Sequence, residues 1–315
     1  MSMTATTSIR KRITHATADA YGQVNHELAR LSKTLHWADA EMPHWQKDNE
    51  FIISGYRRAQ HHWRGTFQSV FGYLHNETVN IHSHLWGAAL FLYISFAIYA
   101  PSRFPDLSLK DFVVFQTFLF TTIFSLGASA FFHTSLCHSE EMATRCNALD
   151  YLGILVQIVG SFAASIYYGF LCHPHHQLTY CGILVAAGFA AGFVVLNPLY
   201  QQPTHRTLRT VIFTAVGWTG GLATAQAWWT HGWDTFYNAM GYKWLLLAAL
   251  TNLTGAFLYA HRFPERLAPG RFDYFFSSHQ ILHGCVILAA LSHFVHVSTC
   301  MHWWYEVGNQ ATCSA

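Results

Sequence analysis

The sequence predicts an all-α fold, an integral membrane bundle of seven transmembrane helices, and three observations support this prediction. First, the chain of 315 residues is 52% hydrophobic and only 11% charged, whereas a soluble domain carries about 25% charged residues. Second, long apolar segments follow one another after a polar N-terminal region. Third, Lys and Arg gather in alternate connections. This composition excludes an ordinary soluble domain, and the net charge of +2 gives no reason to expect a nucleic-acid partner.

Each of the seven apolar segments is long enough to cross a hydrocarbon core of about 30 Å, which takes about 20 helical residues. Prolines lie in several of the short connections between them, where helices end. We expect helices at residues 83–101, 112–135, 149–171, 178–197, 207–229, 242–260 and 275–298. The chain then divides into an N-terminal region (1–75), a seven-helix membrane domain (76–300) and a C-terminal tail (301–315).

Lys and Arg set the expected orientation, because connections on the cytosolic side carry an excess of these residues. The N-terminal region and the connections after the second, fourth and sixth helices hold 15 of them, and the other connections hold 3. We therefore expect a cytosolic N-terminus and an extracellular or lumenal C-terminus. This orientation is the reverse of that of G-protein-coupled receptors, so the count of seven helices does not place the chain in that class.

Three histidines fall near the expected cytosolic ends of two apolar segments. His133 lies at the end of 112–135, and His279 and His283 lie near the start of 275–298. The i, i+4 spacing of the last two puts both rings on one helix face. Three imidazoles with one open position form the ligand set of a catalytic zinc, so we expect a Zn²⁺ site. The alternative is that each ring is a hydrogen-bonded interior residue.

Two more residues share the depth of these histidines. Ser129 precedes His133 by one helical turn, and Asp150 lies at the start of the next apolar segment. Asp150 could accept a proton from a water at the metal or orient that water, and Ser129 could hydrogen-bond the water or a substrate oxygen. Two other interpretations stay open: Asp150 as an N-terminal acid stabilised by the helix dipole, and Ser129 as a small packing residue.

Other polar residues near the first and last segments are expected to serve different purposes. Glu77 and Asn80 precede the first segment, where capping or solvation is the simplest role and support of the metal site is the alternative. His82 and His84 are expected at the membrane interface. His293 lies too far along the last segment to reach the same ion.

The seven cysteines show no CxxC motif and no regular spacing, so they indicate no cysteine zinc site. Two pairs fall on the expected exterior side, Cys172 with Cys181 and Cys300 with Cys313. Because that compartment is oxidising, either pair could form a disulfide, and free thiols are the alternative.

Four stretches resemble the progestin and adipoQ receptor family, also called the hemolysin III family, and in particular its adiponectin-receptor branch with its fungal members. They are HNETVNIHSHLWG (75–87), SAFFHTSLCHSE (129–140), NALDYLG (147–153) and FPERLAPGRFDYFFSSHQILHGC (263–285). The resemblance covers about residues 43–298. One departure is His82, where the animal receptors have an aromatic residue.

This resemblance implies seven helices, a cytosolic N-terminus and a zinc ion near the cytosolic leaflet. In the family, zinc ligands occupy the positions that match His133, His279 and His283. An aspartate matching Asp150 reaches the metal through water, and a serine matching Ser129 lines the site. The family is also similar to alkaline ceramidases in its metal-binding residues, which implies a ceramide-like lipid substrate.

Three functions remain open at this point. The first is zinc-dependent hydrolysis of a ceramide-like lipid amide, linked to signalling and lipid metabolism. The second is a signalling receptor with a structural zinc and an unidentified extracellular ligand, or a role in zinc or sterol homeostasis. The third, zinc transport, is the least favoured, because the two halves of the chain show no repeat. We expect a multi-pass protein of the plasma membrane or an endomembrane, with a homo-oligomer as a possible state.

Overall fold

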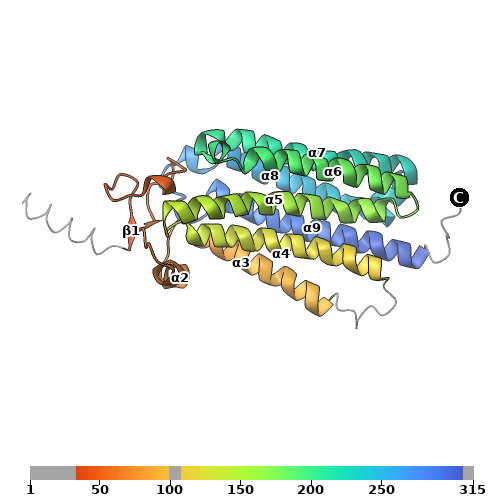
Figure 1. Ribbon diagram of the computed structural model, residues 1–315, viewed down its shortest axis with the longest axis horizontal. Coiled ribbons are helices and arrows are strands. Elements are labelled where there is room, and N and C mark those ends of the chain that lie inside the picture. Colours follow the sequence, from red (N-terminus) through yellow and green to blue (C-terminus); the bar gives the residue numbers. More distant parts are fainter. Residues whose placement is uncertain (1–32, 99–107, 308–315) are drawn as a thin grey trace, which may run out of the picture.

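The computed structural model describes residues 33–98 and 108–307. In these ranges seven long helices run side by side in an elongated bundle, and a smaller polar region lies at one end (Figure 1). The long helices are α3 (Thr78–Tyr93), which continues into the π-helical turn η2 (Ile94–Ile98), then α4 (Leu109–Ser135), α5 (Glu140–Gly169), α6 (Pro174–Val195), α7 (Arg206–His231), α8 (Tyr242–His261) and α9 (Ser278–Val307). The seven expected helices are therefore confirmed.

Short helical turns occupy several connections of the bundle. They are η3 (Pro198–Gln201) and η4 (Pro203–His205) before α7, the π-helical turn η5 (Thr235–Ala239) before α8, and η6 (Glu265–Leu267) before α9. Five of the long helices in the described ranges, α4, α5, α6, α8 and α9, are long and apolar enough to cross a membrane by length and composition. Helix α3 is shorter, with 16 residues.

Helix α5 lies in the middle of the bundle, where it packs against α4, α6, α7 and α9. One continuous apolar core joins the helices, with Phe91, Phe118, Leu155, Leu184 and Val297 among its buried side chains. Large apolar side chains also cover much of the outer surface. In water such a surface would be unfavourable, but a bilayer solvates it.

The start of α5 differs from the sequence prediction. The helix begins at Glu140 and not at residue 149, because the Ser139 side chain accepts a hydrogen bond from the backbone N–H of Met142 and caps the first turn. Glu140 and Glu141 supply the acids of that turn. Asp150 therefore lies well inside the helix, and its interpretation as an N-terminal acid is wrong.

Helices α4 and α5 approach closely at Gly153. A methyl group at this position would lie 3.1 Å from the Cα atom of Ser125 on α4. A larger side chain would push the two helices apart. Because Gly153 follows Asp150 by about one turn, this close approach also keeps Asp150 near the C-terminal half of α4.

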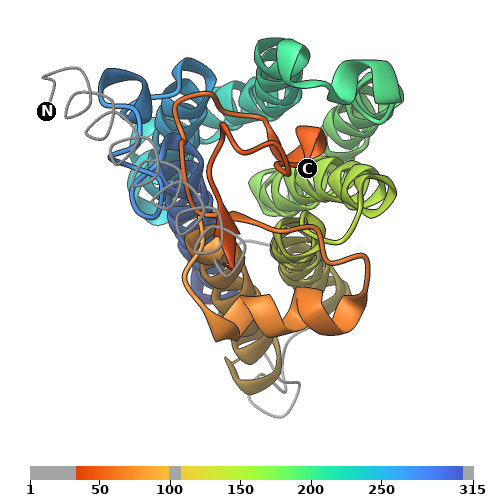
Figure 2. The ribbon, with the colours of Figure 1, turned by 90° about the vertical axis from the view of Figure 1, so that its left-hand side faces the viewer.

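The described residues before α3, 33–77, form what we call the N-terminal strap. Figure 2 shows the strap lying across the ends of the helices. It contains a two-stranded antiparallel sheet of β1 (Thr34–Leu35) and β2 (Tyr56–Arg57), the turn η1 (His44–Gln46) and the short helix α2 (Trp63–Gly72). Leu35, Met42, Ile52 and Tyr56 form a small apolar core of its own.

Two buried carboxylates near the start of α9 hold the strap. Asp273 accepts hydrogen bonds from the backbone N–H groups of Ile53 (2.9 Å) and Ser54 (2.8 Å), and also from the Ser54 hydroxyl (2.6 Å). Glu265 accepts from the Asn49 side chain (3.0 Å) and from the backbone N–H of Ser278 at the first residue of α9 (2.7 Å). The strap and the start of α9 are therefore fixed relative to each other by polar contacts.

Neither expected cysteine pairing forms. Cys181 and Cys300 are free thiols, which contradicts the pairs Cys172–Cys181 and Cys300–Cys313. Cys172 is nevertheless disulfide-bonded. Cys313 lies outside the described residues. Cys181 lies in the N-terminal half of α6 and packs against the apolar core, and Cys300 is buried within that core.

The Asp273 contacts predict that this carboxylate determines the local stability of the strap. Replacing Asp273 by Ala leaves two half-buried strap N–H groups without acceptors, at a cost of up to about 1–3 kcal/mol for each group. We expect the amides of Ile53 and Ser54 to exchange at least about thirtyfold faster with deuterium in detergent. Glu141→Ala removes an exposed carboxylate of α5 and is the matched control. Equal exchange in the two variants would contradict the role given to Asp273.

Candidate metal centre

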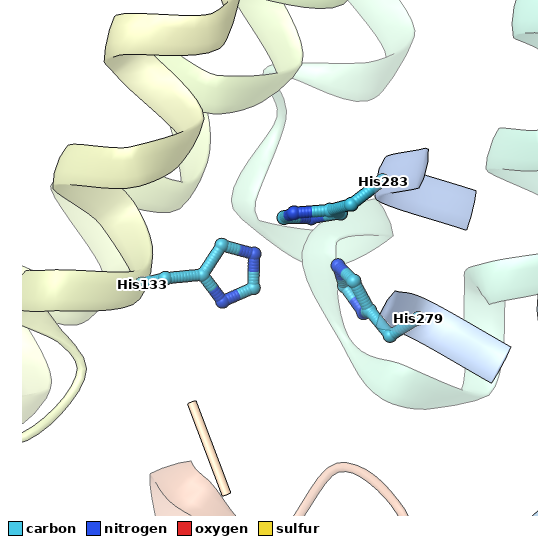
Figure 3. A group of neighbouring side chains, drawn as sticks. All are labelled: His133, His279 and His283. Carbon is cyan, nitrogen blue, oxygen red and sulfur yellow. The ribbon is translucent and has the colours of Figure 1, made fainter. Parts of the chain in front are cut away.

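Three histidine side chains from the ends of two helices converge at the strap end of the bundle. His133 belongs to the last turn of α4, and His279 and His283 belong to the first two turns of α9. One ligand atom from each ring lies within 4.8 Å of the ligand atoms of the other two. The ring centroids are 4.8–4.9 Å apart. Figure 3 shows the three rings grouped around one point. This cluster can hold a metal ion.

The histidines reach this position because each is near a helix end that is held in place. Arg57 of the strap is 1% exposed and donates hydrogen bonds to the backbone carbonyls of His133 and Thr134 (3.1 Å for Thr134). Carbonyl groups in the last turn of a helix have no partner within the helix, so the guanidinium completes the end of α4. On the opposite side, Glu265 holds the first residue of α9. The i, i+4 spacing then places His279 and His283 on one face.

The outer nitrogens of two rings have acceptors. His133 donates from Nδ1 to the Glu77 carboxylate (2.8 Å), and His283 donates from Nδ1 to the backbone carbonyl of Asn80 (3.2 Å). Ser83 also lies 3.2 Å from that nitrogen. In metal sites a ligand histidine commonly donates its other N–H to a carboxylate or carbonyl, which fixes the tautomer and the ring orientation. This leaves Nε2 of each ring to serve as the ligand atom.

The residues present fit a bound cation. The Nε2 atom of His133 is buried and has no hydrogen-bond partner, and an unpartnered buried polar atom costs about 1–3 kcal/mol. His133 and His283 are 2% and 3% exposed. Three neutral imidazoles are ligands that zinc accepts, and a tetrahedral zinc site with three protein ligands keeps one position open.

The two other residues expected at the site lie beside the cluster. The Ser129 hydroxyl lies beside the Asp150 carboxylate, and Asp150 interacts electrostatically with His133. Both residues are buried, at 4% and 9% exposure. The structure therefore brings together all five residues that the sequence analysis selected. Asp150 lies far from the helix start, which contradicts its interpretation as an N-terminal acid, and Ser129 lies beside it.

Glu77 has a different role from the expected helix cap. It occupies the N-cap position of α3, but its side chain makes no capping hydrogen bond. Its carboxylate accepts from His133 and from the Asn80 side chain (2.7 Å). His75 positions the backbone of Glu77, because its Nδ1 accepts from the Glu77 N–H (3.1 Å). Burial, with a smaller contribution from the Arg57 charge, lowers the pKa of His75 to about 3, so this ring is neutral and can accept.

Sequence reasoning missed or misplaced two further residues of this region. Arg57 entered only as a positive charge near the membrane, whereas it completes the helix end that carries His133. His84 was expected at the interface, whereas it is 5% exposed and stacks on His283. One signal was available: Glu77, Asn80 and His84 follow the i, i+3, i+7 spacing of a single helix face.

Two other histidines near these segments make their contacts outside the cluster. His82 donates to the backbone carbonyl of Val70 (2.9 Å) and contacts Phe71, and it is only partly buried. His293 donates to the backbone carbonyl of Ser161 (2.8 Å), two to three turns further along α9 than His283. Neither residue belongs to the cluster of three rings.

Comparison with known proteins assigns the chain to a family. The family described as haemolysin-III related matches residues 72–294, a range that includes all five site residues. The adiponectin receptor protein of Drosophila melanogaster is 37% identical over 267 residues, which cover 84% of this chain and 59% of that protein. The chain thus matches little more than half the length of this animal relative.

Fungal and plant relatives match over most of both chains. The ADIPOR-like receptor IZH2 of Saccharomyces cerevisiae is 33% identical over 270 residues, which cover 85% of each chain. The heptahelical transmembrane protein 1 of Arabidopsis thaliana is 34% identical over 274 residues, which cover 85% of this chain and 82% of that protein. With the apolar helices of the bundle, these matches establish a multi-pass integral membrane protein. The chain is an adiponectin-receptor-like member of the haemolysin-III-related family.

Proposed function

We propose that the centre holds zinc and that the protein hydrolyses the amide bond of a ceramide-like lipid. The observation that carries this proposal is the arrangement around His133, whose Nδ1 donates to Glu77 while its buried Nε2 has no partner. His279 and His283 would supply the other two ligands. A set of three histidines with an open position is typical of catalytic zinc, whereas structural sites have four protein ligands.

When bound, zinc would polarise the amide carbonyl and make a water acidic enough to react at neutral pH. Asp150 takes the proton of the attacking water and passes it to the nitrogen of the leaving amine. Water and the amide thereby become a fatty acid and an amine. Ser129, which lies beside this carboxylate, would donate a hydrogen bond to it and hold it in one orientation. Glu77 keeps His133 in the tautomer that presents Nε2.

A lipid substrate fits the position of the centre. The strap lies across the helix ends, and His133, Asp150 and Arg57 of the strap are all buried. The outer surface of the bundle is apolar, so an acyl chain in the bilayer can approach it without desolvation cost. A substrate that arrives from the membrane reaches a water-poor site, in which the hydrogen bonds around the centre are stronger than in water.

This proposal includes a cytosolic position for the centre and the strap. The Lys and Arg excess at this end of the bundle supports that orientation. The disulfide of Cys172 supports it independently, because Cys172 lies in the connection between α5 and α6 at the opposite end. Disulfides persist in the extracellular or lumenal compartment and are rare in the cytosol.

A signalling receptor with a structural zinc is the second candidate, and the names of the relatives favour it. Both the Drosophila and the yeast relative are named as receptors. In this case zinc would only hold α4 and α9 together. Removal of zinc would then lower the melting temperature, and the zinc-loaded protein would show no lipid turnover at any concentration.

The proposed ligand set predicts the effect of His283→Ala. Loss of one of three ligands should reduce bound zinc from one ion per chain to less than about a tenth. Metal analysis of protein purified in detergent measures the zinc, and mass spectrometry measures the fatty acid released from ceramide. His175→Ala alters an exposed histidine on α6 and should match the wild type in both. Full zinc content in His283→Ala would contradict the ligand assignment.

Asp150→Asn separates the catalytic from the structural role of zinc. The amide has the same shape as the carboxyl group and is not a zinc ligand, so the zinc content should stay at the wild-type level. It cannot take up the proton, and ceramide turnover should fall at least about a hundredfold. Wild-type turnover in this variant would rule out Asp150 as the base. A lack of turnover in the wild type itself would favour the receptor.

Glu77→Gln tests the carboxylate behind His133. Loss of such a partner of a ligand histidine typically weakens metal binding by about 10- to 100-fold. We expect this loss in competition titrations of zinc against a fluorescent chelator. Glu141→Gln changes an exposed carboxylate and is the control. Identical zinc affinities of Glu77→Gln and the wild type would show that the hydrogen bond to His133 does not support metal binding.

A further inference from the structure

His84 on α3 is a buried histidine for which neither the fold nor the three-histidine cluster gives a role. It is 5% exposed, and both of its ring nitrogens are buried without a hydrogen-bond partner. Other histidines nearby have partners: Val70 accepts from His82, and Asn80 accepts from His283. A neutral imidazole has one donor and one acceptor, and leaving both unused in an apolar interior is costly.

The position of His84 connects it to the candidate metal centre. Its ring lies parallel to the ring of His283, with centroids 3.6 Å apart and an interplanar angle of 6°. His84 is not one of the three residues whose ligand atoms lie within 4.8 Å of one another. It therefore contacts a ligand of the proposed metal without belonging to the ligand set.

The helix that carries His84 directs its polar face toward this region. Glu77 at the N-cap of α3 contacts His133, and the Asn80 backbone carbonyl on α3 contacts His283. His84 follows Asn80 by one turn on the same face. Gly87 lies further along this face and packs closely against Leu126 and Ile287. The interior is apolar from this point on. His84 thus lies at the inner boundary of the polar region, on the side where the apolar interior begins.

We propose that His84 binds the polar group of the ligand that occupies the centre, a hydroxyl or a secondary amide. Such a group both donates and accepts a hydrogen bond, which matches the two unused nitrogens of a neutral imidazole. A lipid amide whose polar end enters the centre would present this group at the boundary that His84 marks. The inference rests on the proposed metal centre. It adds to the proposed hydrolysis of a lipid amide by naming His84 as a residue that recognises the substrate.

The stacking on His283 permits a variant that removes only the nitrogens. His84→Phe keeps an aromatic ring that can stack on His283 but has neither donor nor acceptor. His84→Gln keeps one donor and one acceptor without the ring. His82→Phe makes the same exchange two residues away, at a histidine that contacts Phe71 and the Val70 carbonyl but not His283. It serves as the matched control.

Binding to the cobalt-substituted protein tests the proposal. We load the purified full chain with Co²⁺ and titrate octanoyl hydroxamic acid, which carries a carbonyl, an N–H and a hydroxyl on a short acyl chain, while following the visible spectrum. His84→Phe should take up as much cobalt as the wild type but bind the hydroxamate about tenfold more weakly, and His84→Gln should recover most of the affinity. His82→Phe should match the wild type. Equal hydroxamate affinities in His84→Phe and the wild type would overturn the proposal.

A second measurement needs neither metal nor activity. Because the His84 nitrogens have no protein partner, metal-free His84→Phe should unfold at the same temperature as the metal-free wild type or higher. A clearly lower melting temperature would show that protein groups use these nitrogens and would overturn the inference. If the wild type takes up no cobalt or zinc, the proposed metal centre fails, and the melting comparison alone then decides on His84.

Discussion

One constraint governs the strap end of the bundle: a polar group buried among apolar helices must find a partner, because no water is available there. The three converging imidazoles are the largest group of this kind in the described ranges. The Glu77 carboxylate and the Asn80 carbonyl accept hydrogen bonds from the Nδ1–H groups of His133 and His283. The remaining nitrogens of these two rings therefore point toward one another. The same hydrogen bonds that satisfy the outer nitrogens therefore create a concentrated set of ligand atoms at the centre.

The strap extends this constraint to the helix ends. Arg57 completes the C-terminal turn of α4, and Glu265 completes the start of α9, so both histidine-bearing ends are fixed by charged side chains. Asp273 then ties the strap to the segment before α9. Arg57 joins the strap to the end of α4, Glu265 joins it to the start of α9, and Asp273 joins it to the segment before α9. The strap therefore connects both histidine-bearing helix ends. The geometry of the centre thus depends on residues that are neither ligands nor part of the membrane-spanning helices.

The sequence predicted those features that depend on local pattern. Apolar length identified the seven helices, and the i, i+4 spacing placed His279 and His283 on one face. The alternation of Lys and Arg between successive connections then predicted that His133 lies at the same membrane depth as these two residues. The contact of Glu77 with His133 spans 56 residues, and no local pattern reveals it. Asp150 was misplaced within its helix because α5 begins in a charged turn, outside the apolar segment. His84 was misjudged because hydropathy gives the depth of a residue and not the face that it occupies.

The charges around the cluster suit a divalent cation. Two carboxyl groups, Glu77 and Asp150, lie close to His133, whereas the Arg57 guanidinium is directed at helix carbonyls and a serine. A divalent ion among the three rings would use all three ligand nitrogens at once and would balance both carboxylates, in a region where unbalanced charge is costly. The position of Glu77 behind the ring, and not among the ligand atoms, is the arrangement expected when the acceptor supports a metal-binding imidazole.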